Sequence, residues 1–375
     1  MKFSYCKTCL FPNTKPDIYF NKDGICDSCL SAQKKHGFLK SINWDKRKKE
    51  FEKIIKLTKT QSKSSYNCIV PVSGGKDSTW QTYAMKEIQN MKPLAVTFDQ
   101  FDQTEQGKYN LDVLKSIGVD HIHFTINPKI VKNLVKKGFE IVGDPYWINH
   151  VGMFTVPFHF ACKFKISLII YGENPIFEYG GPEKDKNNFI LDKKWRQQFG
   201  GMRGMREEDV LGDKINSDDL RMLTFPSKEE IKKNKVQAIF YGHFFKWEPK
   251  EHTEFVKKLG WKLLQRPQEG SWSKAENIDM QFIDIRERIK FLKYGYGRAT
   301  DQLNIAIRAK QIKREEALKI ASEIDGKVKE ENVRDFCNYL NISETHYQGI
   351  VDSFVNHELF LKDNNGNWRL KFDRK

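Results

Sequence analysis

Six consecutive residues of this chain could bind phosphate. Ser73-Gly74-Gly75-Lys76-Asp77-Ser78 follows the apolar run 66–72 and precedes a predicted helix over residues 79–88. Two glycines allow a tight turn and a close approach of the backbone to a ligand. The amides and dipole at a helix N-terminus attract an anion, Lys76 adds a mobile cation, and the two serines add hydroxyl donors. The sequence predicts a pyrophosphate cradle, with an ordinary strand-to-helix turn as the alternative.

The hexapeptide differs from the Walker phosphate loop, because an aspartate follows its lysine and too few residues precede it. It resembles instead the PP-loop of the ATP pyrophosphatase superfamily. That resemblance implies cleavage of ATP to AMP and pyrophosphate while an oxygen is activated as its adenylate. Asp77 would repel a triphosphate unless Mg²⁺ or the helix terminus compensates, so we expect it to bind magnesium or to brace the loop.

Four of the seven cysteines form two pairs near the N-terminus, Cys6-x-x-Cys9 and Cys26-x-x-Cys29. Sixteen residues separate the pairs, which is zinc-ribbon spacing. Disulfides are disfavoured in the cytoplasm, so we predict a Cys₄ zinc site, with an iron–sulfur cluster as the alternative. Four sulfur ligands leave no open coordination position, and the site is therefore predicted to be structural. The remaining cysteines, Cys68, Cys162 and Cys337, are interpreted as small core residues.

Strand and helix patterns alternate after residue 66. Strands are predicted at 67–72, 93–98, 121–124, 168–171 and 238–241, and helices at 79–88, 105–117 and 129–137. This rhythm is typical of an α/β fold with a parallel sheet, the fold class that we expect. Ligands of such sheets bind at the carboxyl ends of the strands, next to the switch in strand order.

Two strand ends should face the cradle. Asp99 could hold ribose or a metal, although aspartate is also a common turn residue. Glu173 and Asn174 follow another strand, where a turn explains the asparagine but not the glutamate. Five histidines lack metal spacing and are interpreted as structural, with His243 as the one to test. Residues 179–182 form a turn and, as a second interpretation, a lid.

The predicted organisation has four parts. Residues 1–40 form the zinc module, 41–65 a charged helix (44–56) with a linker from residue 58, 66–260 the PP-loop domain, and 261–375 a mainly helical region that closes with a short hairpin near residue 365. Helices there are expected at 279–293, 299–309, 313–324, 330–340 and 344–356. An exposed-looking aromatic and glycine loop, Tyr294-Gly295-Tyr296-Gly297-Arg298, interrupts them and either contacts a ligand or is an ordinary interhelical turn.

Composition narrows the class of protein. The chain has 375 residues, is 39% hydrophobic and carries a net charge of +15. The basic residues are spread among acids, which favours solvated helix faces over a nucleic-acid surface. The excess of positive charge is suited to binding a polyanion such as ATP or a nucleotide sugar. No apolar run is long enough to cross a membrane and no leader precedes the first module, so we expect no membrane insertion and a cytoplasmic location.

Taken together, the motifs resemble the N-acetyl sugar amidotransferases of surface-glycan biosynthesis, a branch of the PP-loop superfamily. The resemblance spans both cysteine pairs, residues 72–78 and 171–174, and Tyr-Gly-Tyr-Gly-Arg-Ala-Thr-Asp at 294–301. It implies conversion of an acetamido group on a nucleotide-linked sugar to an acetamidino group, using ATP, Mg²⁺ and a structural Zn²⁺. Ammonia would come from a separate glutamine amidotransferase subunit and its synthase-like companion, consistent with the lack of a recognisable glutaminase here.

From the motifs and the resemblance together, we expect the following roles for individual residues. Lys76, Asp77, Ser78 and Glu173 would be catalytic, and residues 73–78 with Asp99 would bind ATP. The sugar would be bound by Glu173, Asn174, Tyr294, Tyr296, Arg298 and Asp301.

Two other classes of function remain open. A PP-loop enzyme that thiolates tRNA would use the same adenylation, but it should carry a cysteine pair near the cradle, and Cys162 is the sole cysteine between Gly75 and Asp301. A regulatory nucleotide-binding module would bind ATP without turnover.

Overall fold

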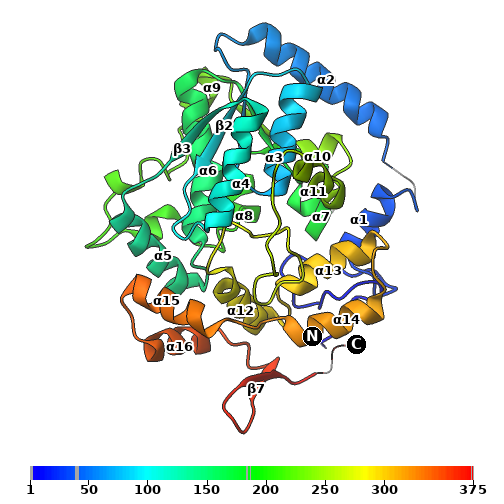
Figure 1. Cartoon of the computed structure of the whole chain (residues 1–375), viewed down its shortest axis with the longest axis vertical. Coiled ribbons are helices and arrows are strands. Elements are labelled where there is room, and N and C mark those ends of the chain that lie inside the picture. The colour runs from blue at the N-terminus through cyan, green and yellow to red at the C-terminus, as the bar shows by residue number, and fades with distance from the viewer. Residues whose placement is uncertain (1–2, 39–41, 183–184, 186, 373, 375) are drawn as a thin grey trace.

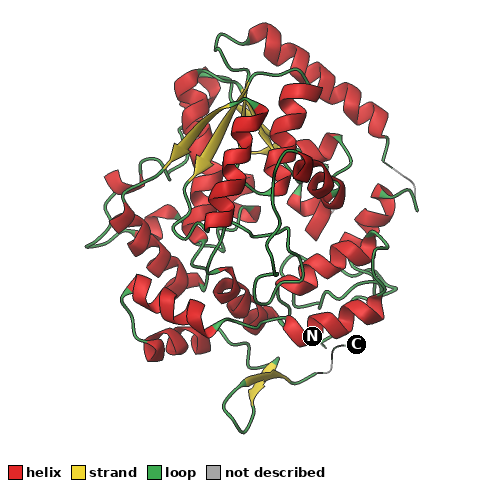
Figure 2. Ribbon diagram, viewed as in Figure 1, coloured by secondary structure: helices red, strands yellow, loops and turns green. Residues whose placement is uncertain are grey.

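The computed structural model describes residues 3–38, 42–182, 185, 187–372 and 374 (Figure 1). A sheet with helices on both faces forms one half of the molecule, and the C-terminal helices form the other half (Figure 2). The predicted α/β class with an N-terminal cysteine cluster and a helical C-terminal region is confirmed. The predicted boundary between residues 40 and 41 lies outside the described residues.

The main sheet has six strands in the order β3-β2-β1-β4-β6-β5. All neighbouring pairs are parallel except β5 and β6. The strands are β1 (Cys68–Pro71), β2 (Pro93–Phe98), β3 (Asp120–Phe124), β4 (Leu168–Tyr171), β5 (Ile190–Leu191) and β6 (Gln237–Phe240). The strand order reverses beside β1, so the segment that follows β1 lies at the switch point where open α/β sheets bind ligands.

Alternate residues of the strands pack on opposite faces of the sheet. On one face, Cys68 and Val70 of β1 pack with residues of α2 (Trp44–Gln61) and α4 (Glu105–Ile117). On the other face, Ile69 packs against α6 (Trp147–Phe164). This period of two is the side-chain geometry of a strand, and both faces are apolar because helices cover both.

Three of the helices predicted before residue 150 differ from their predicted bounds. Helix α3 (Lys76–Tyr83) begins inside the hexapeptide, three residues earlier than expected, and continues as a π-helical turn, Ala84–Ile88. Helix α2 extends to Gln61, so the first residues of the predicted linker are helical. Helix α5 (Pro128–Val142) is five residues longer at its C-terminus than predicted and ends at Gly143, which adopts a left-handed conformation.

Helix α6 was not predicted from the sequence. It contains Pro157, and its buried residues lie on all sides rather than on one stripe. A helix that is apolar all round gives no amphipathic period, so its pattern does not distinguish it from a buried strand or loop.

Shorter helices connect these elements. They are α1 (Asp27–Lys35), α7 (Pro175–Tyr179), α8 (Lys193–Phe199), α9 (Lys228–Lys233), α10 (Tyr241–Phe244) and α11 (Pro249–Lys258). Helix α10 begins where the predicted last strand was expected to end, because β6 stops at Phe240.

The C-terminal region contains five helices and a hairpin among its described residues. They are α12 (Ile283–Tyr294), α13 (Arg298–Arg308), α14 (Arg314–Ile324), α15 (Glu330–Leu340) and α16 (Glu344–Ser353), with β7 (Phe360–Lys362) paired to β8 (Trp368–Leu370). Helices α12, α15 and α16 share one apolar core with α5 and the start of α6. The predicted hairpin near residue 365 is confirmed. Helix α16 ends three residues earlier than predicted, and α12 begins four residues later than predicted, because the backbone of residues 280–281 bonds to residues 102–103 instead. Among the described helices, none has both the length and the apolar character required to cross a bilayer.

The cysteine-bearing N-terminal segment packs against the C-terminal helices rather than standing apart (Figure 1). Leu10 joins the core of α13 and α14, and its backbone N–H donates to the side chain of Asn304 at 2.7 Å. The first and last parts of the chain therefore form one packed unit.

Candidate active site

The loop between β1 and α3 is closed by contacts that only glycine permits. Gly74 has φ +85°, and a Cβ there would lie 2.9 Å from the backbone nitrogen of Leu111 in α4. Gly75 caps the N-terminus of α3. The hydroxyl of Ser78 donates to the carbonyl of Gly75 at 3.1 Å and accepts from the backbone N–H of Ser73 at 3.4 Å. Ser78 therefore shapes the loop as well as offering an oxygen near a ligand.

Lys76 is held in place, so the prediction of a mobile cation is wrong. It is 6% exposed, and its Nζ lies 2.8 Å from Asp77 Oδ2 and 3.7 Å from Glu276 Oε1. Burial alone would lower its pKa, but the two carboxylates dominate and raise the pKa of Lys76 to about 12. A fixed positive charge therefore stands at the first residue of α3.

Asp77 is braced by a histidine that the sequence gave no reason to single out. Nδ1 of His252, in α11, lies 2.8 Å from Asp77 Oδ1. The imidazole is packed between Trp80 and Trp247, with ring centroids 5.3 and 4.5 Å away. Burial favours the neutral acid, yet Lys76 and His252 outweigh it and lower the pKa of Asp77 to about 2. Asp77 is thus an oriented carboxylate, as magnesium binding or loop bracing would require.

A segment without regular secondary structure, residues 259–282, crosses the loop and joins the sheet domain to the C-terminal helices. The indole N–H of Trp261 donates to the carbonyl of Gly74 at 2.8 Å. Asp279 accepts hydrogen bonds from Ser73 and Gln100. A Cβ at Gly107 would lie 2.6 Å from the Asp279 Cα, so α4 and this segment are in direct contact. The segment also supplies Glu276, which the sequence analysis missed because its partner is 200 residues away in the chain.

Glu173 reaches the same site from the carboxyl end of β4. Its carboxylate accepts a hydrogen bond from the hydroxyl of Tyr179 at 3.3 Å. Burial, reinforced by the negative charges of Asp77 and Glu178, raises the pKa of Glu173 to about 8. A carboxyl group that keeps its proton at neutral pH is a hydrogen-bond donor, and perturbed groups of this kind concentrate in functional sites.

Two other predicted residues have structural partners. Asn174 is 1% exposed, caps α7 by accepting from the N–H of Ile176 at 3.2 Å, and donates to the carbonyl of Asn188. A buried cap does not fit the predicted role in binding sugar. Asp99 lies at the end of β2, as expected, but its carboxylate contacts His123 at 2.9 Å and Thr125 at 3.0 Å on the β3 side.

The loop of residues 294–301 is packed inside the molecule, which corrects the expectation that it is exposed. Arg298 forms an ion pair with Glu276, and Asp301 lies 2.7 Å from Lys290. Tyr296 is 6% exposed and its ring packs edge-on against Phe11 of the cysteine module at 5.5 Å. Through Glu276, Arg298 is connected to Lys76, so this loop supports the cradle from behind.

The backbone of Tyr294 also contacts the cysteine module. Its carbonyl accepts a hydrogen bond from the Thr14 hydroxyl at 2.6 Å. Loop 294–301 therefore contacts both the cradle and the cysteine module.

His243, the histidine chosen for testing, is buried beside Phe189 with a ring-centroid distance of 4.9 Å. Burial lowers the pKa of His243 to about 3, which agrees with a structural role.

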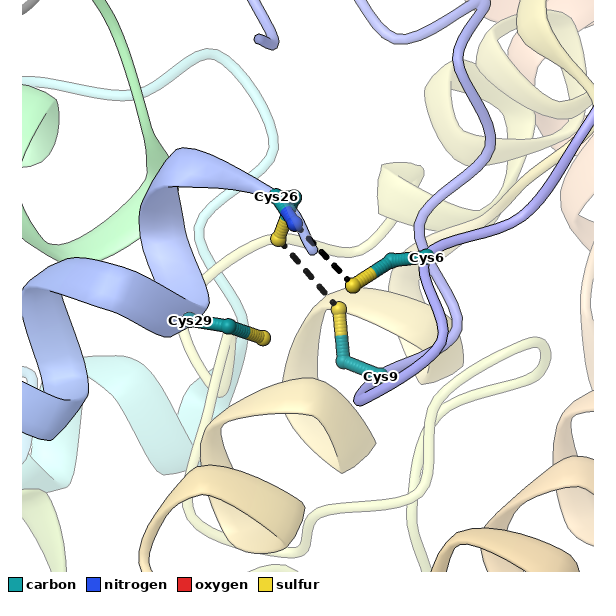
Figure 3. Close-up of side chains that lie close together, drawn as sticks. All are labelled: Cys6, Cys9, Cys26 and Cys29. Carbon is teal, nitrogen blue, oxygen red and sulfur yellow. Dashed lines mark hydrogen bonds between the residues drawn. The ribbon is translucent and has the colours of Figure 1, made fainter. Parts of the chain in front are cut away.

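The four N-terminal cysteines converge on one point (Figure 3). Their Sγ atoms all lie within 4.8 Å of one another, and all four residues are buried. Backbone N–H groups of Cys26 and Thr8 point to Cys6 Sγ at 3.2 and 3.4 Å, which suits a thiolate. Four converging thiolates fit a structural metal, either zinc or an iron–sulfur cluster.

In a comparison with known proteins, the C-terminal part of the chain matches the model of one family. Residues 270–373 match the family described as "LPS biosynthesis protein WbpG-like, C-terminal domain". An uncharacterized protein of Methanocaldococcus jannaschii is 33% identical over 117 residues, which are 31% of this chain and 40% of that protein. The chain thus matches about two fifths of the length of this relative.

Two solved structures were also compared. NMN synthetase from Francisella tularensis has 12% identity and a TM-score of 0.30, with coverage of 63% of this chain and 90% of that one. The U34-tRNA thiolase NcsA from Methanococcus maripaludis, solved with its [4Fe-4S] cluster, has 13% identity and a TM-score of 0.32, with coverage of 87% and 90%. Scores of this size do not establish a shared function. The family match, in contrast, agrees with the resemblance found in the sequence: residues 270–373 are similar to the C-terminal domain of WbpG-like LPS biosynthesis proteins.

Proposed function

We propose that this protein is an ATP-dependent amidotransferase of surface-glycan biosynthesis. It would adenylate the acetamido oxygen of an N-acetylated, nucleotide-linked sugar and replace that oxygen with ammonia, giving an acetamidino group. The observation that carries the proposal is the glycine-closed loop 73–78 at the start of α3, in a chain with a WbpG-like C-terminal domain.

The chemistry explains why ATP is split to AMP and pyrophosphate. An amide oxygen is a poor leaving group, so AMP is first transferred to it, forming an O-adenylated imidate and releasing pyrophosphate. Ammonia then adds to the imidate carbon, and AMP leaves with the former amide oxygen. The nitrogen of ammonia stays on the carbon as the amidine, and no protein nucleophile is required.

The chain's own residues would stabilise the charges of this reaction. Lys76 and the free amides of α3 would hold the pyrophosphate as it leaves. Asp77, braced by His252, would hold Mg²⁺, which neutralises phosphate charge when bound. The protonated carboxyl of Glu173 would donate a hydrogen bond to the polar end of the acetamido group or its adenylate.

Ammonia would come from partner proteins. We propose a glutamine amidotransferase subunit and its synthase-like companion, because this chain has no recognisable glutaminase site. Ammonium salts should then replace the partners in vitro.

Thiolation of tRNA is the second candidate. That reaction needs a reactive cysteine close to the adenylated base. Cys162 is at the C-terminal end of α6 and is hydrogen-bonded with Asn234, so it lies near the amino ends of β4 and β6. The cradle is at the opposite, carboxyl ends of the strands, which favours the amidotransferase reaction.

The decisive assay incubates the protein with Mg-ATP, ammonium and a panel of acetamido nucleotide sugars. We expect AMP and pyrophosphate, together with a sugar product about one mass unit lighter that remains protonated near neutral pH, unlike its parent amide. Asp77→Ala and Ser78→Ala should greatly reduce the turnover rate while changing the free energy of unfolding much less. Accumulation of ADP and phosphate would contradict the proposed ATP cleavage, and thiolated tRNA in a parallel sulfur-donor assay would favour the second candidate.

A further inference from the structure

A cavity of about 200 Å³ lies beside the cradle, between the cysteine module and the C-terminal helices. Its walls come from α1, α7, α11, α13 and residues 272–276. Lys76 and Glu276, which form the 3.7 Å ion pair described above, both belong to its lining. A ligand in this cavity would therefore contact the residues that hold the phosphate loop.

The lining residues change from exposed to buried along the cavity. Trp272, Lys250 and Glu254 are exposed, whereas Lys76 and Gln302 are buried. The cavity thus opens to solvent near Trp272 and ends at the cradle. This arrangement suits a substrate that enters from outside and presents one end to the reacting phosphate.

One wall of the cavity is fixed by Gln302 of α13. Its side-chain oxygen accepts the backbone N–H groups of Trp272 at 2.7 Å and Ser273 at 3.0 Å, and its nitrogen lies 3.3 Å from Glu276 Oε2. Because Arg298 holds the same carboxylate oxygen, Glu276 is fixed from two sides. The wall is therefore preorganised in the protein without a ligand.

The chemistry of the lining residues is suited to binding a single monosaccharide unit. Carboxylate oxygens of Glu178 and Glu276 can accept hydrogen bonds from sugar hydroxyls. The indole of Trp272 is 37% exposed and offers an apolar surface to the C–H face of a pyranose ring. The cavity is smaller than the ~300–1,000 Å³ that drug-sized ligands occupy, so a monosaccharide fits and a whole nucleotide sugar does not. The diphosphate would remain outside, near Lys250.

We propose that this cavity binds the sugar end of the N-acetylated nucleotide sugar, with Trp272 against the ring and the acetamido group directed to Lys76 and Glu276. The inference rests on the proposed amidotransferase function. It places the sugar between α1 and α13 instead of on loop 294–301, whose Arg298 and Asp301 already have charged partners. Arg298 then acts as a positioning residue for Glu276.

The test compares three variants of the full chain. Trp272→Ala removes the apolar surface, and Ala32→Trp fills the cavity from α1. Phe164→Ala is the control, because Phe164 has a similar exposure of 39% and lies at the C-terminal end of α6, near the amino ends of the sheet strands. The measurements are KM for ATP and for UDP-, GDP- and CMP-linked acetamido sugars in the ammonium assay, and binding of the same sugars by calorimetry.

We expect both cavity variants to raise the KM for the sugar and to weaken sugar binding roughly tenfold, because one loses apolar contact and the other loses space. Their KM for ATP should not change. The Phe164→Ala control should keep the wild-type KM values for both substrates. If wild type forms product and both cavity variants retain its sugar KM, the cavity assignment is overturned and the proposed function stands. If wild type binds a sugar in a Trp272-dependent way without converting it, the cavity assignment is supported and the proposed function fails. If wild type neither converts nor binds any member of the panel, both fall.

Discussion

The imidazole of His252 and the carboxylate of Asp77 face each other at 2.8 Å, although 175 positions separate them in the chain. His252 belongs to α11 and Asp77 to α3, and the two helices are packed together through Trp80 and Phe255. This contact fixes the orientation of the only carboxylate inside the hexapeptide. It also makes α11, far from the loop in sequence, part of the cradle.

His252→Phe should slow the release of AMP and pyrophosphate by about tenfold, because a hydrogen bond to a charged group contributes about 1.5–3 kcal/mol. The phenyl ring keeps the apolar contacts with Trp80 and Trp247, so Tm should change little. His243→Phe, at a buried histidine outside the cradle, is the matched control. Unchanged turnover in His252→Phe would show that Asp77 does not depend on this contact.

Glu276→Ala should destabilise the fold by about 3–5 kcal/mol, because half-buried Arg298 loses its nearest carboxylate and buried Lys76 keeps only Asp77. Burial works against ionisation of Glu276, but Arg298 and Lys76 lower its pKa overall, so the charge is present at neutral pH. Urea unfolding measures the effect. The exposed Glu254, in the same cavity wall, is the control, and Glu254→Ala should change stability by no more than about 0.5 kcal/mol. Equal effects of the two substitutions would contradict the role assigned to Glu276.

Stability should depend on pH through Glu173. Burial raises its pKa from 4.5 to about 8, so the folded state binds this proton more tightly than the unfolded chain. The associated stability, a few kcal/mol, is therefore fully present below about pH 4.5 and is lost as the pH rises through about 8. Glu173→Gln, which stays neutral, should remove this part of the pH dependence in urea unfolding curves. Curves for wild type and variant that stay parallel across this range would disprove a raised pKa.

Cys26→Ser should reduce bound metal and lower Tm, because a closed thiolate site stabilises the module that binds it. The effect should extend to the C-terminal helices, since Arg314 donates to the backbone carbonyl of Cys9 and Leu10 packs with α13 and α14. Elemental analysis and thermal unfolding are the measurements, with Cys162→Ser as the control outside the cluster. Freshly purified wild type that contains neither zinc nor iron would refute the metal site.

The sequence alone determined features whose partners are close together in the chain. The strands at 93–98 and 168–171, the convergence of the cysteine knuckles and the strand-to-helix turn at the hexapeptide were predicted correctly because a local pattern fixes each of them. Period-two alternation, ligand spacing and turn chemistry require no knowledge of distant residues. The residues of the hexapeptide were therefore found before their surroundings were known.

Only the tertiary structure decided what surrounds these motifs. Lys76 is buried next to Glu276, which comes from the segment after α11. Asp77 is oriented by its contact with His252 of α11. Tyr296 supports the cysteine module rather than facing solvent, since the two ends of the chain pack together. Such contacts depend on how helices and sheet close around a shared core, and residues 175–285 positions apart leave no periodic signal in a single sequence.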